Sequence, residues 1–165
     1  MTDTVVSYPD TAHATHRERL TLRKSAKLRH RTLVQGVFDK GKSVYSGPLR
    51  FTFRTLNEQE LANSFKVAIP DKIGPLQVMI TVPKKKRRHA VDRVLMRRRI
   101  REAFRLQCGK LWTLVKDDPT IRTLSIAIVY TQSVNTPMSD ISPAVDSAIA
   151  KITKKVWQQP LPNNN

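Results

Sequence analysis

Acidic residues are scarce in this sequence. Its 165 residues include 13 Asp and Glu against 30 Lys and Arg, which gives a formal net charge of +17 at neutral pH. An excess of one sign repels itself in a compact state, and a bound polyanion offsets that cost. Nucleic acid is the commonest polyanionic partner of such proteins, and an anionic membrane surface is the other candidate.

Cysteine and long apolar runs are nearly absent. With one cysteine, Cys108, the chain has no intramolecular disulfide, which is typical of a reducing compartment. The longest apolar runs, at 78–82 and 126–130, fall far short of the ~20 residues that a membrane-spanning helix needs. The N-terminus contains Asp3 and Asp10 and no apolar signal segment. The sequence therefore predicts a cytoplasmic protein with no membrane partner.

The sequence also shows no cluster of His, Asp or Glu residues that would indicate a metal-binding or catalytic site. The carboxylates of Asp92 and Glu102 would lie about 15 Å apart along a helix, too far to share one metal ion. The histidines stand in the polar N-terminal region or among cations: His13, His16, His30 and His89. A nuclease that uses its own metal centre is disfavoured, and no catalytic residue and no protein-bound metal is predicted.

The length suits one domain, which we expect at 19–158 between flexible tails at 1–18 and 159–165. Apolar periodicity and turn residues predict helices and strands in a definite order. The expected helices are 30–39, 89–116 and 142–157, and the expected strands are 49–56, 65–69, 77–82 and 124–130. This order predicts an α+β fold in which three helices pack on a four-stranded sheet.

The strongest feature is basic. Half of the residues from 84 to 105 are Lys or Arg. Arginines at 93, 97, 101 and 105 recur every four residues, so they follow one slowly drifting face of the expected helix. A solvated helix face usually alternates signs, whereas this one repeats like charges that repel. Guanidinium groups match phosphate oxygens, so the pattern favours a polyanion surface, although charge alone does not separate RNA from duplex DNA.

Residues 90–104 resemble the signature helix of the bacterial ribonuclease P protein subunit. Residues 81–85 resemble the strand end and Lys pair that precede that helix, and residues 24–29 and 37–42 resemble the opening segment of the family. The likeness extends over about residues 20–106. Two departures stand out: Val94 and Leu95 replace the usual Asn and Arg after Arg93, and Val34 replaces an aromatic.

The resemblance implies an α/β sandwich whose basic helix forms a left-handed βαβ crossover. It implies a subunit that helps to remove the 5′ leader of precursor tRNA, with hydrolysis by a catalytic RNA and its Mg²⁺ ions. The expected partners are that RNA and precursor tRNA, with no obligate protein partner. The RNA-binding candidates are Lys27, Arg29, Lys84, Lys85, Lys86, Arg87, Arg88, Arg93, Arg97, Arg98, Arg101 and Arg105.

The same resemblance implies a cleft for the leader between the first helix and the sheet. Its candidates are Phe38, Phe51, Phe53 and Thr81, together with Lys84. Aromatic residues in strands and apolar stripes are more often core residues, so this interpretation competes with a packing role. A non-catalytic RNA-binding protein, such as a ribosomal protein, remains the alternative function, because it shares the charge and the small size.

Overall fold

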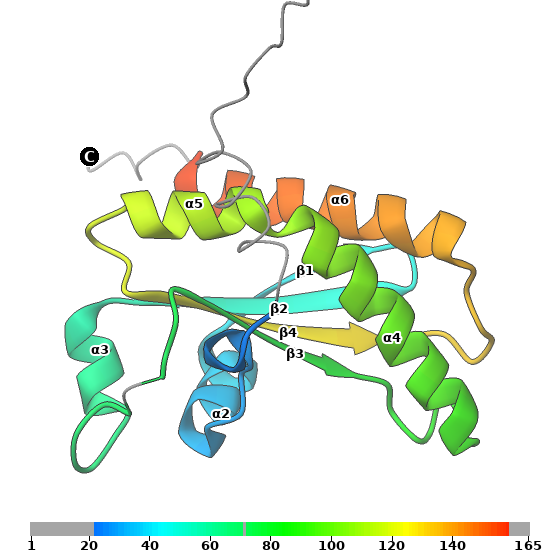
Figure 1. The fold of residues 1–165 in the computed structure, drawn as a ribbon, viewed down its shortest axis with the longest axis horizontal. Coiled ribbons are helices and arrows are strands. Elements are labelled where there is room, and N and C mark those ends of the chain that lie inside the picture. Colours follow the sequence, from blue (N-terminus) through cyan, green and yellow to red (C-terminus); the bar gives the residue numbers. More distant parts are fainter. Residues whose placement is uncertain (1–21, 71, 159–165) are drawn as a thin grey trace, which may run out of the picture.

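The computed structural model describes residues 22–70 and 72–158, and the predicted tails at 1–18 and 159–165 lie outside them. Helices precede, interrupt and follow a small sheet (Figure 1). In chain order the elements are η1 Lys24–Ala26, α2 Arg31–Lys40, β1 Lys42–Ser46, β2 Leu49–Leu56, α3 Glu58–Asn63, β3 Leu76–Thr81, α4 Ala90–Gln107, α5 Gly109–Asp117, β4 Thr123–Tyr130 and α6 Met138–Trp157. None of the helices within these residues is long and apolar enough to cross a membrane.

The sheet has four strands in the order β1-β2-β4-β3. A tight turn at Gly47, whose φ is +51°, joins β1 to β2 as an antiparallel hairpin. The strand β4 pairs antiparallel with β2 and parallel with β3. Since β3 and β4 are parallel neighbours, α4 and α5 form the crossover between them. The expected left-handedness of this connection stays a prediction.

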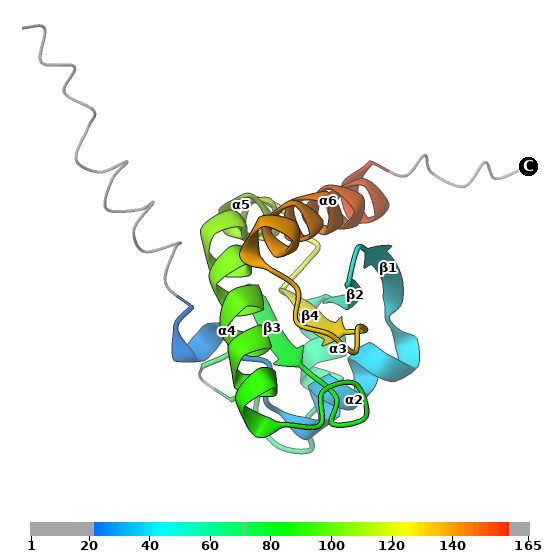
Figure 2. The ribbon, with the colours of Figure 1, turned by 90° about the vertical axis from the view of Figure 1, so that its right-hand side faces the viewer.

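Helices cover both faces of the sheet (Figures 1 and 2). On one face, α4, α5 and α6 enclose the larger core, in which Phe51 and Ile126 from the strands meet Phe104 from α4. On the other face, α2 and α3 close a smaller core around Val37 and Leu56. The side chains of β2 alternate between these two cores, which is the strand period of two. The α+β sandwich with a four-stranded sheet is confirmed.

One predicted strand is wrong, and one was missed. Residues 65–69 form a bend followed by irregular chain, and Phe65 packs against the smaller core without joining the sheet. The fourth strand is instead β1, a short edge strand with exposed polar residues. Residues 57–63, for which no helix was predicted, contain α3. A capping box starts this helix, because Asn57 Oδ1 accepts from the Glu60 amide at 2.8 Å and the Glu60 carboxylate accepts from the Asn57 amide at 2.9 Å.

Two predicted helices have different bounds. The long helix expected at 89–116 divides at Cys108 into α4 and α5. The last helix begins at Met138, before the Ser142-Pro143 pair that was expected to start it. Pro143 lies exposed near the N-terminal end of α6, where its missing amide removes one backbone hydrogen bond without ending the helix. The three expected helices therefore become five among the described residues.

Candidate nucleic-acid interface

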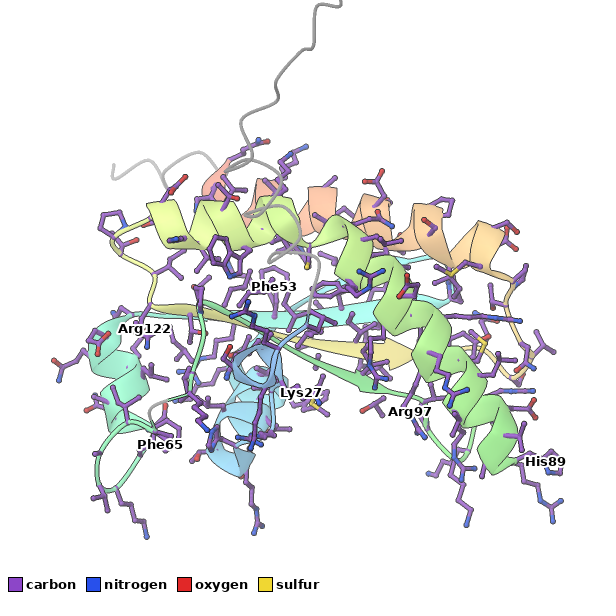
Figure 3. The ribbon with its side chains drawn as sticks, in the orientation of Figure 1. Lys27, Phe53, Phe65, His89, Arg97 and Arg122 are labelled. Carbon is purple, nitrogen blue, oxygen red and sulfur yellow. The ribbon has the colours of Figure 1, made fainter. Side chains whose placement is uncertain are left out.

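The basic helix α4 has one buried side. Met96, Ile100, Ala103 and Phe104 are fully buried against the sheet and α6. The arginines occupy the remaining sides of the helix, so none of them points into the core. Arg98 and Arg101 are exposed, and Arg97 is half-buried on the flank of the helix. Figure 3 shows α4 extending away from the sheet to His89, so its N-terminal turns are open to solvent.

Several basic side chains at the start of α4 bind the protein itself. The Arg93 guanidinium donates from Nη1 to the carbonyl oxygens of Arg87 at 3.0 Å and Arg88 at 2.6 Å. The Arg99 guanidinium donates to the Thr136 carbonyl at 2.7 Å. These bonds fix the backbone of the 84–88 loop and tie the 131–137 loop to α4. Arg87, Arg93 and Arg99 are thus partly structural, although two of them were predicted as RNA-binding residues.

Asp92 is the acidic centre of this junction. Its carboxylate accepts from Asn135 Nδ2 at 3.0 Å and pairs with Arg87 Nη2 at 3.0 Å, while Arg87 also donates to the Ser133 carbonyl. The hydrogen bond from Asn135 and the charge of Arg87 lower the pKa of Asp92 below its usual value. Asp92 therefore stays ionised at neutral pH and connects the basic loop, α4 and the 131–137 loop.

The second acid on α4 neutralises one arginine. Glu102 and Arg105 form a two-bond ion pair, with Nη2–Oε1 at 2.6 Å and Nε–Oε2 at 3.0 Å. The hydrogen bond from Arg105 lowers the pKa of Glu102. Because this charge is already matched, Arg105 is the weakest phosphate candidate in the helical row. Within the 84–88 loop and α4, the exposed candidates with no ion pair among the described residues are Lys84, Lys85, Lys86, Arg88, Arg98 and Arg101.

A hollow of about 430 Å³ lies beside the outer edge of β3. The Leu28 amide donates to the Val78 carbonyl at 3.0 Å and holds the segment after η1 against that edge. Lys27 and Arg29 from this segment and Arg101 from α4 line the hollow. Three RNA-binding candidates far apart in the sequence therefore meet in one basic groove, whose floor is formed by apolar strand residues.

Two of the five cleft candidates face the larger core, on the other side of the sheet from α2. Phe51 and Phe53 are 0% and 3% exposed in the larger core, and Figure 3 shows Phe53 between the sheet and α5. Since α2 packs on the opposite face and both rings are buried, neither ring is exposed for stacking between α2 and the sheet. This part of the prediction is wrong because the alternation of β2 was assigned to the wrong face. Phe38, 42% exposed on α2, and Thr81, half-buried on the α2 face, fit the predicted location.

Sequence reasoning missed Arg50 and Arg54, the residues between those phenylalanines. Both point to the α2 face by strand alternation, and Nε of Arg50 is buried with no hydrogen-bond partner among the described residues. A Cβ at Gly36 would come within 2.5 Å of Arg54 Nη1, so the glycine lets this guanidinium lie against α2. Tyr45, 63% exposed, stands opposite Arg50 in the register of β1 and β2. The alternating pattern of 49–56 was the signal that could have identified the two arginines.

Protein-based catalysis has no obvious centre here. Within residues 22–70 and 72–158, no group of three or more His, Cys, Asp or Glu side chains is placed to hold a metal ion. Burial raises the pKa of the Cys108 thiol to about 11, so it stays protonated and unreactive at neutral pH. The carboxylates of Asp92 and Glu102 are engaged by cations, so they do not suit Mg²⁺ coordination as they stand.

Comparison with known proteins gives a consistent relationship. The family model for ribonuclease P matches residues 22–152. The ribonuclease P protein components of two strains of Porphyromonas gingivalis are each 30% identical over 108 residues, which is 66% of this chain and 70% of the relative. The ribonuclease P protein of Staphylococcus aureus has a similar fold, with a TM-score of 0.51, 22% identity, and coverage of 78% of this chain and 95% of the other. A mutant of that protein matches with a TM-score of 0.52 and 20% identity, and the match covers 79% of this chain and 90% of the mutant. The chain belongs to the ribonuclease P protein family.

Proposed function

We propose that the free basic residues of the 84–88 loop and α4 bind the phosphate backbone of the ribonuclease P RNA. The chain is the protein subunit of this ribonucleoprotein, which matures the 5′ ends of tRNA. The observation that carries the proposal is that the loop and α4 expose six cations, while the other side of α4 is fully buried. These cations are Lys84–Lys86, Arg88, Arg98 and Arg101. Each phosphate that these cations contact releases counterions, so the affinity depends on salt.

The groove beside β3 extends this surface. Lys27 and Arg29 add two cations from a segment that is hydrogen-bonded to the sheet edge, and Arg101 adds one from α4. Because these side chains come from two separate elements on one rigid sheet, they fix the direction of an RNA strand across the helix. Val94, 38% exposed, interrupts the row where the family usually has a polar residue, so we place the main contacts at the later turns of α4.

The α2 face of the sheet suits a single-stranded segment, namely the 5′ leader of precursor tRNA. Phe38 offers an exposed ring for base stacking, and Tyr45 offers a second on the same face of the sheet. Arg50 adds a buried guanidinium nitrogen with an unused donor. We assign leader binding to this face and hydrolysis to the RNA subunit with its Mg²⁺ ions, so the protein supplies binding and orientation. We propose no obligate protein partner.

Reconstitution tests the proposed function. The full-length protein is added to its ribonuclease P RNA at low Mg²⁺, and cleavage of precursor tRNA at the 5′ end of the mature sequence is measured. We expect faster cleavage than with the RNA alone, and a smaller gain with Arg98→Ala/Arg101→Ala. The control variant is Lys66→Ala, an exposed lysine next to Phe65 at the end of the molecule away from His89 (Figure 3). Unchanged cleavage on addition of the wild-type protein would overturn the proposal.

The alternative of a ribosomal-type binding protein is not favoured by the family relationship. A separate measurement distinguishes it from the proposed function. Affinity purification of the tagged protein from its own cells is expected to recover the catalytic RNA. Enrichment of ribosomal RNA, with no catalytic RNA, would favour the alternative.

A further inference from the structure

A second row of cations lies at the opposite edge of the sheet from α4. The edge strand β1 turns two carbonyl groups outward, and lysines of α6 bind both: Lys151 Nζ donates to Tyr45 O at 2.7 Å, and Lys155 Nζ donates to Ser43 O at 3.1 Å. Four residues of helix rise about 6 Å, and two residues of strand span nearly the same length, about 6.6 Å. The match lets the lysines sit one behind the other along the strand.

These two ammonium groups are held in place by β1 and still have hydrogen-bond donors for a ligand. An ammonium group has three donors, and each of these lysines gives one of them to a backbone carbonyl. Both keep donors for a further acceptor. Lys154, between them in sequence, is exposed and has no hydrogen bond to the strand among the described contacts.

The surface around the row is concave and basic. A hollow of about 550 Å³ is lined by Tyr45, Lys151, Lys154 and Lys155. A second hollow, of about 460 Å³, shares Lys155 and continues past Lys40, Lys42 and Arg54. Together these residues form what we call the β1-edge surface, defined by Lys40, Lys42, Lys151, Lys154 and Lys155.

Acidic residues do not neutralise this surface. Among the described residues, Glu60 is the only acidic side chain that lines either hollow, and its carboxylate accepts from the Asn57 amide in the capping box of α3. None of the ion pairs within the described part of the chain includes one of the five lysines. The dipoles of α2 and α6 favour cations at their C-terminal ends. They do not explain why Lys151 and Lys155 both bind backbone carbonyls of β1.

We propose that the β1-edge surface is a second phosphate-binding site for RNA, separate from α4. Figure 2 shows β1 and α4 on opposite sides of the molecule, so both surfaces can be occupied at once. The ligand is an RNA phosphate backbone, because ammonium groups act as point charges that match phosphates whatever the base sequence. The inference rests on the proposed function, and the RNA is either a second segment of the catalytic RNA or the body of the precursor tRNA.

The test uses the full-length protein and measures affinity against salt in two arms. One arm binds ribonuclease P RNA alone, and the other binds precursor tRNA to the assembled holoenzyme. The variant is Lys151→Gln/Lys154→Gln/Lys155→Gln. The matched control removes three exposed lysines elsewhere: Lys66→Gln/Lys72→Gln/Lys110→Gln. The slope of log affinity against log salt is negative. We expect the α6 variant to reduce the magnitude of this slope by about 1 or more beyond the control.

The arm that changes identifies the source of the phosphates. Equal changes in affinity and salt dependence for the α6 variant and the control, in both arms, would overturn the inference. The three lysines would then contribute only net charge and their hydrogen bonds to β1. The single variant Lys154→Gln separates loss of RNA binding from loss of structure, because no described contact joins this lysine to β1. If Arg98→Ala/Arg101→Ala weakens binding while the α6 variants do not, only this inference fails. If the α4 variant also has no effect, the proposed function fails as well.

Discussion

Arg87 Nη2 and Asp92 Oδ2 lie 3.0 Å apart, and this pair joins the basic loop to the first turn of α4. Asn135 donates to the same carboxylate from the 131–137 loop, and Arg93 binds the backbone of the basic loop from the helix side. The positive segment is thus organised around one acid. Its charge divides into cations that shape the loop and cations that remain for a ligand.

Replacing Asp92 tests this organisation. Removing a negative charge beside an RNA surface should strengthen RNA binding if charge alone matters. We expect Asp92→Asn to weaken it instead, because Arg87 loses its partner and the 84–88 loop is no longer fixed. RNA affinity of Asp92→Asn and of Glu102→Gln, measured at equal salt, checks this point. Both variants remove one acid from α4, and stronger binding by both would show that the Arg87–Asp92 pair has no positioning role.

Which cations bind the protein itself and which remain for a ligand could not be derived from the sequence. Arg93 and Arg99 fit the basic pattern as well as Arg98 and Arg101 do, but the acceptor of Arg99 is a carbonyl on a loop after β4. Only the tertiary structure brings that carbonyl to α4. In contrast, Met96, Ile100 and Phe104 are fully buried, and their spacing of four residues is a local pattern that can be read from the sequence.

Strand assignment failed for a related reason. Residues 65–69 have the apolar character of a strand, but they form a bend and irregular chain, from which Phe65 makes an edge-to-face contact with His30. The true edge strand β1 is polar and short, and its hydrogen bonds to β2 and the lysines of α6 stabilise it. Pairing of this kind depends on neighbours, so β propensity alone is a weak guide.

The two sides of α4 should respond differently to truncation. Phe104 is fully buried, and Phe104→Ala should reduce the free energy of unfolding by about 3–5 kcal/mol, through lost burial and the resulting cavity. Arg101→Ala removes an exposed side chain, so it should change stability by less than about 0.5 kcal/mol while weakening RNA binding and lowering its salt slope. Urea unfolding and salt-dependent binding separate these effects. Similar unfolding of both variants would mean that Arg101 supports the core.

Phe38 on α2 and Phe51 on β2 provide a second comparison. Phe38→Ala should leave the fold largely intact and weaken binding of a leader-containing precursor tRNA to the holoenzyme, because its ring is exposed. Phe51→Ala should destabilise the protein by about 3–5 kcal/mol, because its ring fills the larger core. The control substrate is mature tRNA, which lacks the leader. A loss of affinity for both RNAs with Phe38→Ala would argue against leader recognition.

Stability at acid pH should report on Asp118, which joins the end of α5 to the C-terminal turn of α6. Its carboxylate accepts from the Thr120 hydroxyl and from Trp157 Nε1, the latter at 3.0 Å. The hydrogen bond from Thr120, with that from Trp157, lowers the pKa of Asp118 below its ordinary 3.8. The folded state therefore binds a proton at Asp118 more weakly than the unfolded state does. The resulting stabilisation is complete above the pKa that Asp118 has in the unfolded state. It is lost as the pH falls through the lower folded value. Urea unfolding followed by tryptophan fluorescence between pH 2 and about 6 should show a smaller acid-dependent loss in Asp118→Asn than in the wild type. Identical pH dependence of the two proteins would mean that other carboxylates account for the acid sensitivity.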